Sequence, residues 1–220
     1  MIEKQYTAIL FDLDGTLLDT ANDLGAALNY VLSKYNIAEV SKELFRPVAS
    51  DGAKGLLELG FGEQLTHYNY ETLRGEFLNY YQKNIAVQTC FYPGIEELLT
   101  NLIDNNIPWG VVTNKPIDLT LDLLPHFSIF SHCCSIVGGD SLKEKKPHPA
   151  PLLYACKQMN VDASRCIYVG DAIRDIEAGN AANMYTIIAE WGYILDKYSC
   201  LNWQADLIAV DANRISQIIL

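Results

Sequence analysis

Two carboxylates, a glycine and a hydroxyl follow a short apolar run near the start of the chain, in the segment Ala8 to Thr16. An apolar run that stops at such a turn is typical of a buried parallel strand. Asp12 and Asp14 are two positions apart, so their side chains would leave an extended backbone on the same face. Ligands bind outside the carboxyl ends of strands in open α/β sheets. The segment therefore indicates chemistry at a strand end.

This segment has two other interpretations. An Asp-x-Asp-Gly sequence also occurs in ordinary turns, where the side chains bond to the backbone. A calcium loop that begins at Asp12 would need a glycine at its sixth position and a glutamate at its twelfth. Those positions hold Leu17 and Asp23, which excludes the calcium loop. The ordinary turn stays open on this segment alone.

Further polar groups follow later apolar runs. Thr113 and Asn114 end a run that begins at Trp109, and Asp171 ends the run that begins at Cys166. Strands that alternate with helices predict a doubly wound, Rossmann-like, mostly parallel sheet. We expect three polar strand ends at one edge of this sheet, with Lys146 on a loop between the second and the third. Further strands are expected at 135–139, 185–189 and 207–210, and helices at 95–105, 117–124, 149–159 and from Ile173.

This set of side chains favours phosphate chemistry. Carboxylates that meet at one point repel each other, so a divalent cation must neutralise them or some must stay protonated. Ligands that are all oxygen suit Mg²⁺. With Lys146 and the Thr113 hydroxyl, such a cation would make a site for a phosphate dianion. Because these segments hold no Ser–His pair or activated Cys, the expected nucleophile is a carboxylate that forms an aspartyl-phosphate, with a neighbouring carboxylate as acid and base.

The segment between the first and second strands indicates an inserted domain. It reads as helical and is too long for an ordinary crossover, so we expect a helical domain at 17–89 and a core formed by 1–16 and 90–220. Its first helix shows apolar spacing from Leu24 to Leu32, with Thr20 or Asn22 as its cap. Arg46 and Lys54 are its candidates for contact with a substrate; the alternative is that both only cover a solvated helix surface.

Composition limits the classes of function. A chain of 220 residues, half of them apolar, is long enough for one core with a smaller insertion. The formal net charge of −11 argues against nucleic acid or an anionic membrane as a partner. No apolar run approaches the roughly 20 residues that cross a bilayer. Glu3, Lys4 and Gln5 precede only a strand-length apolar run, so no signal peptide is expected.

The cysteines indicate a reducing compartment. They show no C-x-x-C spacing and several lie in apolar segments, so we expect buried thiols in a cytoplasmic protein, with neither disulfide nor metal role. They are Cys90, Cys133, Cys134, Cys156, Cys166 and Cys200.

Four segments together resemble the motifs of the haloacid dehalogenase superfamily, in its phosphatase branch. They begin at Asp12, Val112, Lys146 and Gly170, and the helical insertion is similar to the small cap of that superfamily. The resemblance implies that Asp12 is the nucleophile and Asp14 the general acid and base. It also implies Mg²⁺ as cofactor. The implied phosphate-binding residues are Thr113, Asn114 and Lys146, and the implied metal ligands are Asp12, Asp14 through its backbone carbonyl, Asp171 and Asp175.

Within the superfamily the chain is similar to the phosphoglycolate phosphatases. The loops at 109–116, 146–153, 168–179, 191–194 and 203–206 are closer still to bacterial N-acetylmuramic acid 6-phosphate phosphatases. The resemblance implies a phosphomonoesterase that hydrolyses one of these two substrates, a small phosphorylated metabolite, as a monomer or homodimer.

Two competing functions remain open at this stage. A receiver-type signalling domain also places Asp, Thr and Lys around Mg²⁺ on a parallel sheet, but it is shorter and has no counterpart of Asp14 as acid and base. A sugar phosphomutase of the same fold would need a bisphosphate activator, whereas a phosphatase releases inorganic phosphate.

Overall fold

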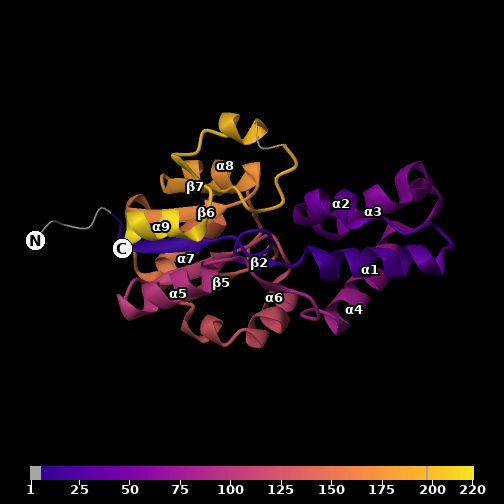
Figure 1. The fold of residues 1–220 in the computed structure, drawn as a ribbon, viewed down its shortest axis with the longest axis horizontal. Coiled ribbons are helices and arrows are strands. Elements are labelled where there is room, and N and C mark those ends of the chain that lie inside the picture. The colour runs from indigo at the N-terminus through magenta and orange to yellow at the C-terminus, as the bar shows by residue number, and fades with distance from the viewer. Residues whose placement is uncertain (1–5, 197) are drawn as a thin grey trace, which may run out of the picture. The chain divides into compact units, whose positions relative to one another are not determined.

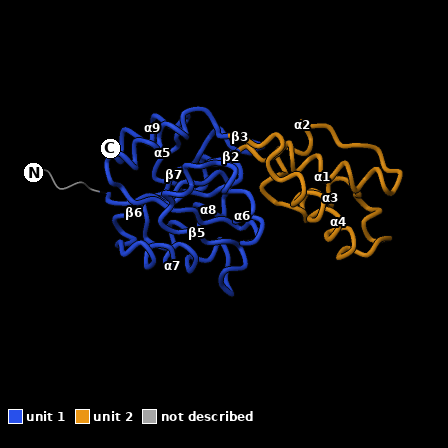
Figure 2. Tube along the Cα trace, turned by 90° about the horizontal axis from the view of Figure 1, so that it is seen from below, with its two compact units in different colours: residues 1–18, 91–220 blue, residues 19–90 orange. Residues whose placement is uncertain are grey.

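The computed structural model describes residues 6–196 and 198–220. The chain divides into two compact units, one formed by residues 1–18 and 91–220 and the other by residues 19–90 (Figure 2). The sequence placed these boundaries at 16/17 and 89/90. The signal-peptide expectation rests on Glu3, Lys4 and Gln5, which lie outside the described residues.

The first unit is built on a six-stranded sheet in the order β5-β4-β1-β6-β7-β8, with helices around it (Figure 1). Every described strand pair in it is parallel. This confirms the predicted doubly wound α/β architecture. The strands are β1 Ala8–Phe11, β4 Trp109–Val112, β5 Ser135–Val137, β6 Cys166–Gly170, β7 Tyr185–Ala189 and β8 Leu207–Ala209.

Strand β1 lies between β4 and β6, and the register aligns the carboxyl ends of the three strands. Phe11 is opposite Val111 on one side and Val169 on the other. The residues that follow, among them Asp12 and Asp171, therefore meet at the same edge of the sheet. The predicted gathering of polar strand ends is confirmed.

All residues of β1, β4 and β6 are buried, so both faces of this part of the sheet are covered. Leu152 and Cys156 of α7 and Ala178 of α8 pack with Leu10 and Tyr168 in one cluster. The helices of this unit are α5 Ile95–Asp104, α6 Ile117–Leu123, α7 Ala150–Met159, α8 Ile173–Ala181 and α9 Ala212–Ile219. The sequence did not predict α9, whose eight residues are stabilised by burial of Ala212, Ile215 and Ile219.

The second unit is helical, as predicted. Its core is the buried face of α1, which includes Leu24, Leu28 and Val31. Close packing is shown at Gly25, where an added Cβ would lie 2.3 Å from the Phe45 ring. Its helices are α1 Ala21–Lys34, α2 Lys42–Phe45, α3 Gly52–Phe61 and α4 Tyr70–Lys83.

Two details of the chain between the units differ from the sequence expectation. The strands β2 (Leu18–Asp19) and β3 (Cys90–Phe91) pair with each other and were not predicted, because two-residue strands carry no periodic signal. Thr20 occupies the N-cap position of α1 in a helical conformation, without a side-chain capping bond. Asn22 lies inside the helix, so its assignment as a cap was wrong.

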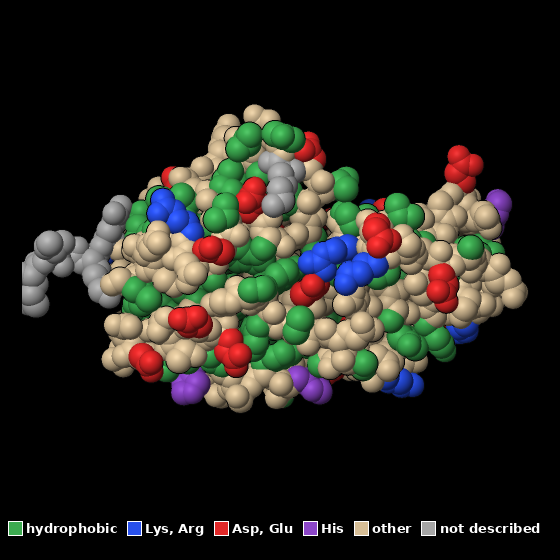
Figure 3. Space-filling model, in the orientation of Figure 1, with side chains coloured by type: hydrophobic (Ala, Val, Ile, Leu, Met, Phe, Trp, Pro, Cys, Tyr) green, Lys and Arg blue, Asp and Glu red, His purple; other side chains and the backbone are tan. Residues whose placement is uncertain are grey.

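The cysteine expectation was wrong in part. Cys156, Cys166 and Cys200 are buried, but Cys90 and Cys134 are exposed because they lie at a short linker strand and in a loop. The surface in Figure 3 carries scattered acidic side chains, in keeping with the net charge of −11. Among the described residues, no helix is both long and apolar enough to cross a membrane.

Candidate active site

The turn after β1 positions Asp12 at the edge of the sheet. Asp12 is buried, and its backbone N–H donates to the Val169 carbonyl at 2.8 Å, which ties it to β6. Gly15 turns the chain with a φ of +87°, and a Cβ there would lie 2.2 Å from the Asp171 carboxylate. Glycine is therefore required by both the backbone conformation and the close approach of a functional side chain.

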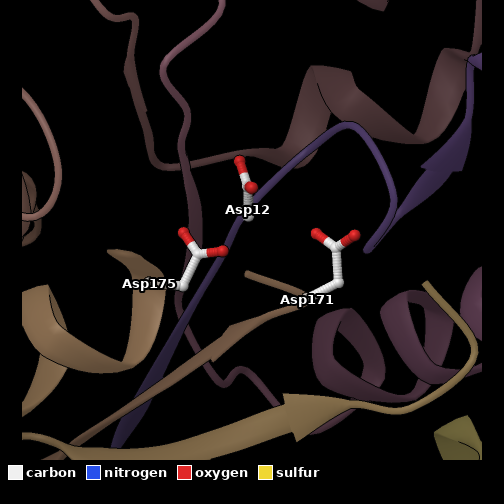
Figure 4. A group of neighbouring side chains, drawn as sticks. All are labelled: Asp12, Asp171 and Asp175. Atoms are coloured by element: carbon white, nitrogen blue, oxygen red, sulfur yellow. The ribbon is translucent and has the colours of Figure 1, made fainter. Parts of the chain in front are cut away.

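Asp12, Asp171 and Asp175 form a buried group of carboxylates. One oxygen of each lies within 4.8 Å of one oxygen of each of the others. Figure 4 shows the three side chains leaving the ribbon in the same general direction, from the ends of neighbouring strands and the start of α8. Asp14, the fourth predicted metal residue, is not in this group; the contact predicted for it was through its backbone carbonyl.

Lys146 is a buried cation in contact with two members of this group. Its Nζ lies 2.9 Å from Asp12 Oδ1 and 2.7 Å from Asp175 Oδ1. The same ammonium donates to the Val112 carbonyl at 2.9 Å and to the Tyr168 hydroxyl at 2.8 Å. A buried ammonium is expensive unless its donors are satisfied, and these contacts satisfy them.

Asp175 is held by three donors. Its Oδ1 accepts from Lys146 and from the Tyr168 hydroxyl, at 3.1 Å for the latter, and its Oδ2 accepts from the Ala172 N–H at 3.0 Å. Gly170 leaves room for it, since a Cβ there would lie 2.3 Å from Asp175 Cβ. Asp175 therefore fixes Lys146 against the first turn of α8.

Asp171 is held by the loop after β7. Its Oδ2 accepts from the Tyr193 N–H at 2.9 Å, and its Oδ1 accepts from the Thr16 hydroxyl at 3.3 Å. The indole N–H of Trp191 donates to the Thr16 carbonyl at 3.0 Å. Gly192 must be glycine here, because a Cβ would lie 2.2 Å from Asp171 Cβ. This loop thus orients Asp171 across the sheet edge.

The acidic group carries more negative charge than its surroundings compensate. Burial, followed by the charges of Asp12 and Asp175, raises the pKa of Asp171 from 3.8 to about 7. Burial and the charge of Asp175 raise the pKa of Asp12 to about 6, although Lys146 acts in the opposite direction. Oxygen donors that are buried, close together and short of positive charge are the donor set that a hard divalent cation takes. The residues present therefore fit a metal site.

Asp14 forms an ion pair that the sequence did not predict. The Lys115 Nζ lies 3.0 Å from its Oδ1 and 3.2 Å from its Oδ2. Lys115 comes two residues after Thr113, so the only sequence signal was a lysine at a strand end next to a candidate site residue.

Thr113 and Asn114 differ in their contacts. Thr113 is buried, and its hydroxyl accepts the Lys115 N–H at 3.1 Å. The Asn114 amide bonds to the Lys146 backbone in both directions, donating to its carbonyl at 3.0 Å and accepting from its N–H at 3.1 Å. The side chain of Asn114 therefore holds the Lys146 loop in place.

Arg46 and Lys54 belong to the second unit. Arg46 Nη1 lies 2.8 and 2.7 Å from the two carboxylate oxygens of Asp19. Lys54 is exposed, and its Nζ is 3.9 Å from Glu58 Oε1. Their predicted contact with a substrate stays a prediction.

A comparison with known families agrees with this geometry. The family described as "Haloacid dehalogenase-like hydrolase" matches residues 9–189, which include the three buried aspartates, Lys146 and Lys115. The chain belongs to this family of hydrolases.

Curated relatives of the chain carry the names of phosphatases. A phosphoglycolate phosphatase of Xanthomonas campestris pv. campestris (strain 8004) is 42% identical over 201 residues, which cover 91% of this chain and 90% of the relative. An N-acetylmuramic acid 6-phosphate phosphatase of Pseudomonas aeruginosa is 38% identical over 219 residues, covering 100% and 97%. The protein is accordingly an enzyme of the phosphoric monoester hydrolase class.

The fold is shared with a solved structure. A crystal structure described as a predicted phosphoglycolate phosphatase from Haemophilus somnus has a TM-score of 0.88 and 28% identity, and the match covers 99% of this chain and 100% of that chain. Within this fold, sequence reasoning missed Lys115 and Tyr168. Both are ordinary residues in a strand or at its end, and only contacts between strands show what they do.

Proposed function

We propose that this protein is an Mg²⁺-dependent phosphomonoesterase that hydrolyses a small phosphorylated metabolite through an aspartyl-phosphate on Asp12. The observation that carries the proposal is the contact pattern of the Asp12 carboxylate. Its contacts with the Leu13 N–H at 2.7 Å and with Lys146 both involve Oδ1. Neither contact involves Oδ2, so Oδ2 is the oxygen that we propose attacks phosphorus.

The reaction needs two displacements at phosphorus. In the first, Asp12 Oδ2 forms a bond to phosphorus while the bond to the leaving oxygen breaks and Asp14 protonates that oxygen. In the second, Asp14 takes a proton from water, whose oxygen bonds to phosphorus as the bond to Asp12 breaks. Asp14 suits this role because its side chain is 15% exposed, whereas Asp12, at 5%, is enclosed.

The other residues position the phosphate. Lys146 keeps Asp12 oriented and places a positive charge next to the attacked group. The buried Thr113, which follows β4, is proposed to bind a phosphate oxygen together with Lys146. For Asn114 we propose an indirect part in phosphate binding, because its amide holds the Lys146 backbone. Catalysis of phosphoryl transfer rests mainly on such positioning and on charge stabilisation.

Mg²⁺ would be held by Asp12, Asp171 and the Asp14 backbone carbonyl, with Asp175 supporting the site. When bound, the cation neutralises the carboxylates and the charge on the phosphate. The Asp171 carboxylate is suited to bind the cation because hydrogen bonds from the Tyr193 N–H and the Thr16 hydroxyl fix its orientation.

For the substrate we propose 2-phosphoglycolate or N-acetylmuramic acid 6-phosphate, the two compounds in the names of the relatives. Both are phosphate monoesters of a molecule that also carries a carboxylate. Arg46 and Lys54 of the second unit are cationic candidates for contact with that second acidic group.

Phosphate release with Mg²⁺ tests this function. The panel holds both proposed substrates, common sugar phosphates and p-nitrophenyl phosphate, with EDTA as the control. We expect one of the two carboxylate-bearing esters to be preferred and EDTA to stop release. Phosphate transfer that requires a bisphosphate activator would instead identify a mutase, and release that is indifferent to EDTA would contradict the metal assignment.

A further inference from the structure

Lys115 is buried against Asp14 in the first unit. Its side chain is 5% exposed, and its Nζ contacts both oxygens of the Asp14 carboxylate, at 3.0 and 3.2 Å. An ion pair between long exposed side chains fixes little, because both partners move freely in water. Here the cation is enclosed and its contact has two points, so the direction of the carboxylate is defined.

The backbone of Lys115 is anchored on both sides. Its N–H donates to the Thr113 hydroxyl at 3.1 Å, and its carbonyl accepts the Gly139 N–H at 2.8 Å. The two loops approach so closely that a Cβ at Gly139 would lie 2.2 Å from the Asn114 carbonyl. Since β4 and β1 are neighbours in the sheet, Lys115 reaches from the end of one strand to the loop after the other. The core of the unit therefore fixes the position of its ammonium.

The two buried lysines, Lys115 and Lys146, form ion pairs with different carboxylates. Lys146 contacts Asp12 and Asp175, on the side of the nucleophile. Lys115 contacts Asp14, which lies outside the group of three neighbouring aspartates. Asp14 is partly exposed and follows the nucleophile by two residues, and the two-point contact with Lys115 sets the direction of its carboxylate.

We propose that Lys115 is a positioning residue that holds the Asp14 carboxylate in the direction from which it exchanges protons with the leaving group and with water. This inference rests on the proposed phosphatase mechanism and deepens it. A displacement of about 1 Å in a reacting group costs on the order of 10²-fold in rate. Loss of Lys115 should therefore act on turnover and leave substrate binding nearly unchanged.

Steady-state kinetics of three variants test the inference, with Mg²⁺ and p-nitrophenyl phosphate or the best ester of the panel. Lys115→Met removes the charge at similar length, and Lys115→Arg keeps the charge. Lys143→Met is the matched control, because Lys143 is an exposed lysine on the loop before Lys146. We expect Lys115→Met to lower kcat about 10- to 100-fold with KM within about 3-fold, and Lys115→Arg to recover part of this loss. Lys143→Met should match the wild type.

A double-mutant cycle separates positioning from other roles. If Lys115 acts through Asp14, adding Lys115→Met to Asp14→Asn should cost no further activity. A further loss of the same size in that background would overturn the inference. So would a rise in KM without a change in kcat, which would place Lys115 on the phosphate itself. Thermal unfolding of each variant shows whether it folds. If Lys115→Met does not fold, Lys115→Arg replaces it in the double-mutant cycle.

Failure of the proposed function would look different. It would appear in the wild type as no phosphate release from any ester, and in Asp14→Asn as no phosphoenzyme from p-nitrophenyl phosphate, whose leaving group departs without a proton. If the wild type is active and Asp14→Asn accumulates phosphoenzyme while Lys115→Met behaves as wild type, only the inference about Lys115 fails.

Discussion

The buried aspartates should make the metal-free protein less stable as the pH rises, and Asp171→Asn should remove most of this effect. A carboxyl group whose pKa is raised by folding binds its proton more tightly in the folded state than in the unfolded chain. Its ionisation therefore costs nothing below pH about 4, costs progressively more up to the folded pKa, and costs a constant amount above it. With folded pKa values of about 7 for Asp171 and about 6 for Asp12, the loss of stability falls between pH 4 and 7.

The magnitude follows from the larger shift. The pKa of Asp171 rises from 3.8 to about 7, and one pKa unit corresponds to about 1.4 kcal/mol, so its ionisation costs up to ~4 kcal/mol of folding free energy. Asp12 shares the same mutual repulsion, so its contribution is not added in full. Asn at 171 keeps one acceptor and loses one hydrogen bond, worth about 1 kcal/mol. The expected net gain at pH 8 is therefore roughly 2–3 kcal/mol, or about 4–12 °C in Tm for a chain of this size.

Thermal unfolding in EDTA at pH 5 and pH 8 measures this effect. Asp171→Asn should unfold at a higher temperature than the wild type at pH 8, and at nearly the same temperature at pH 5. Mg²⁺ at pH 8 should stabilise the wild type and have little effect on the variant. The control is Glu177→Gln, which removes an exposed carboxylate from α8. The reasoning is refuted if Asp171→Asn is less stable than the wild type at pH 8 and keeps its pH dependence.

Three other predictions follow from single features. Asp12→Asn should lower turnover on the order of 10⁴-fold or more without unfolding the protein, as measured by phosphate release and circular dichroism; appreciable remaining activity would exclude Asp12 as nucleophile. Asp23→Ala should destabilise the second unit by about 2 kcal/mol in urea unfolding. The reason is that the buried Asp23 carboxylate accepts the Gln88 N–H and both the N–H and the hydroxyl of Thr89. Asp23→Asn, which keeps one acceptor oxygen, should lose less stability. A maleimide should label Cys90 and Cys134 first by mass spectrometry and Cys133 slowly, because burial raises the pKa of the Cys133 thiol to about 12; rapid labelling of Cys156 would contradict the described burial.

The bounds of helices and strands with a clear apolar pattern were largely predictable from the sequence. The bounds of β7 agree with the expectation, and the ends of α5, α6, α7 and β8 differ by a residue. These elements carry strong apolar periodicity and clear turn residues. The C-terminal helix α9 and the paired strands β2 and β3 were not predicted. The first is short, and the strands exist only because two segments far apart in the chain lie side by side.

The sequence by itself determined which polar groups gather at the site. Strands that run parallel in one sheet bring their carboxyl ends to one edge, so Asp12 and Asp171 were expected at the same edge wherever the exact bounds fell. It also determined the class of chemistry, because oxygen ligands, a lysine and a hydroxyl suit a metal and a phosphate.

Only the tertiary structure decided how these groups divide their contacts. Lys146 binds two carboxylates, a tyrosine hydroxyl and a backbone carbonyl, whereas Lys115 takes Asp14. Two of these pairings, Lys146 with Asp12 and Lys115 with Asp14, join residues more than a hundred positions apart, through a positive φ at Gly15 and close loop contacts at Gly139. No local pattern encodes such distances, because a side chain's partner depends on which strands are neighbours and on how the turns between them aim it.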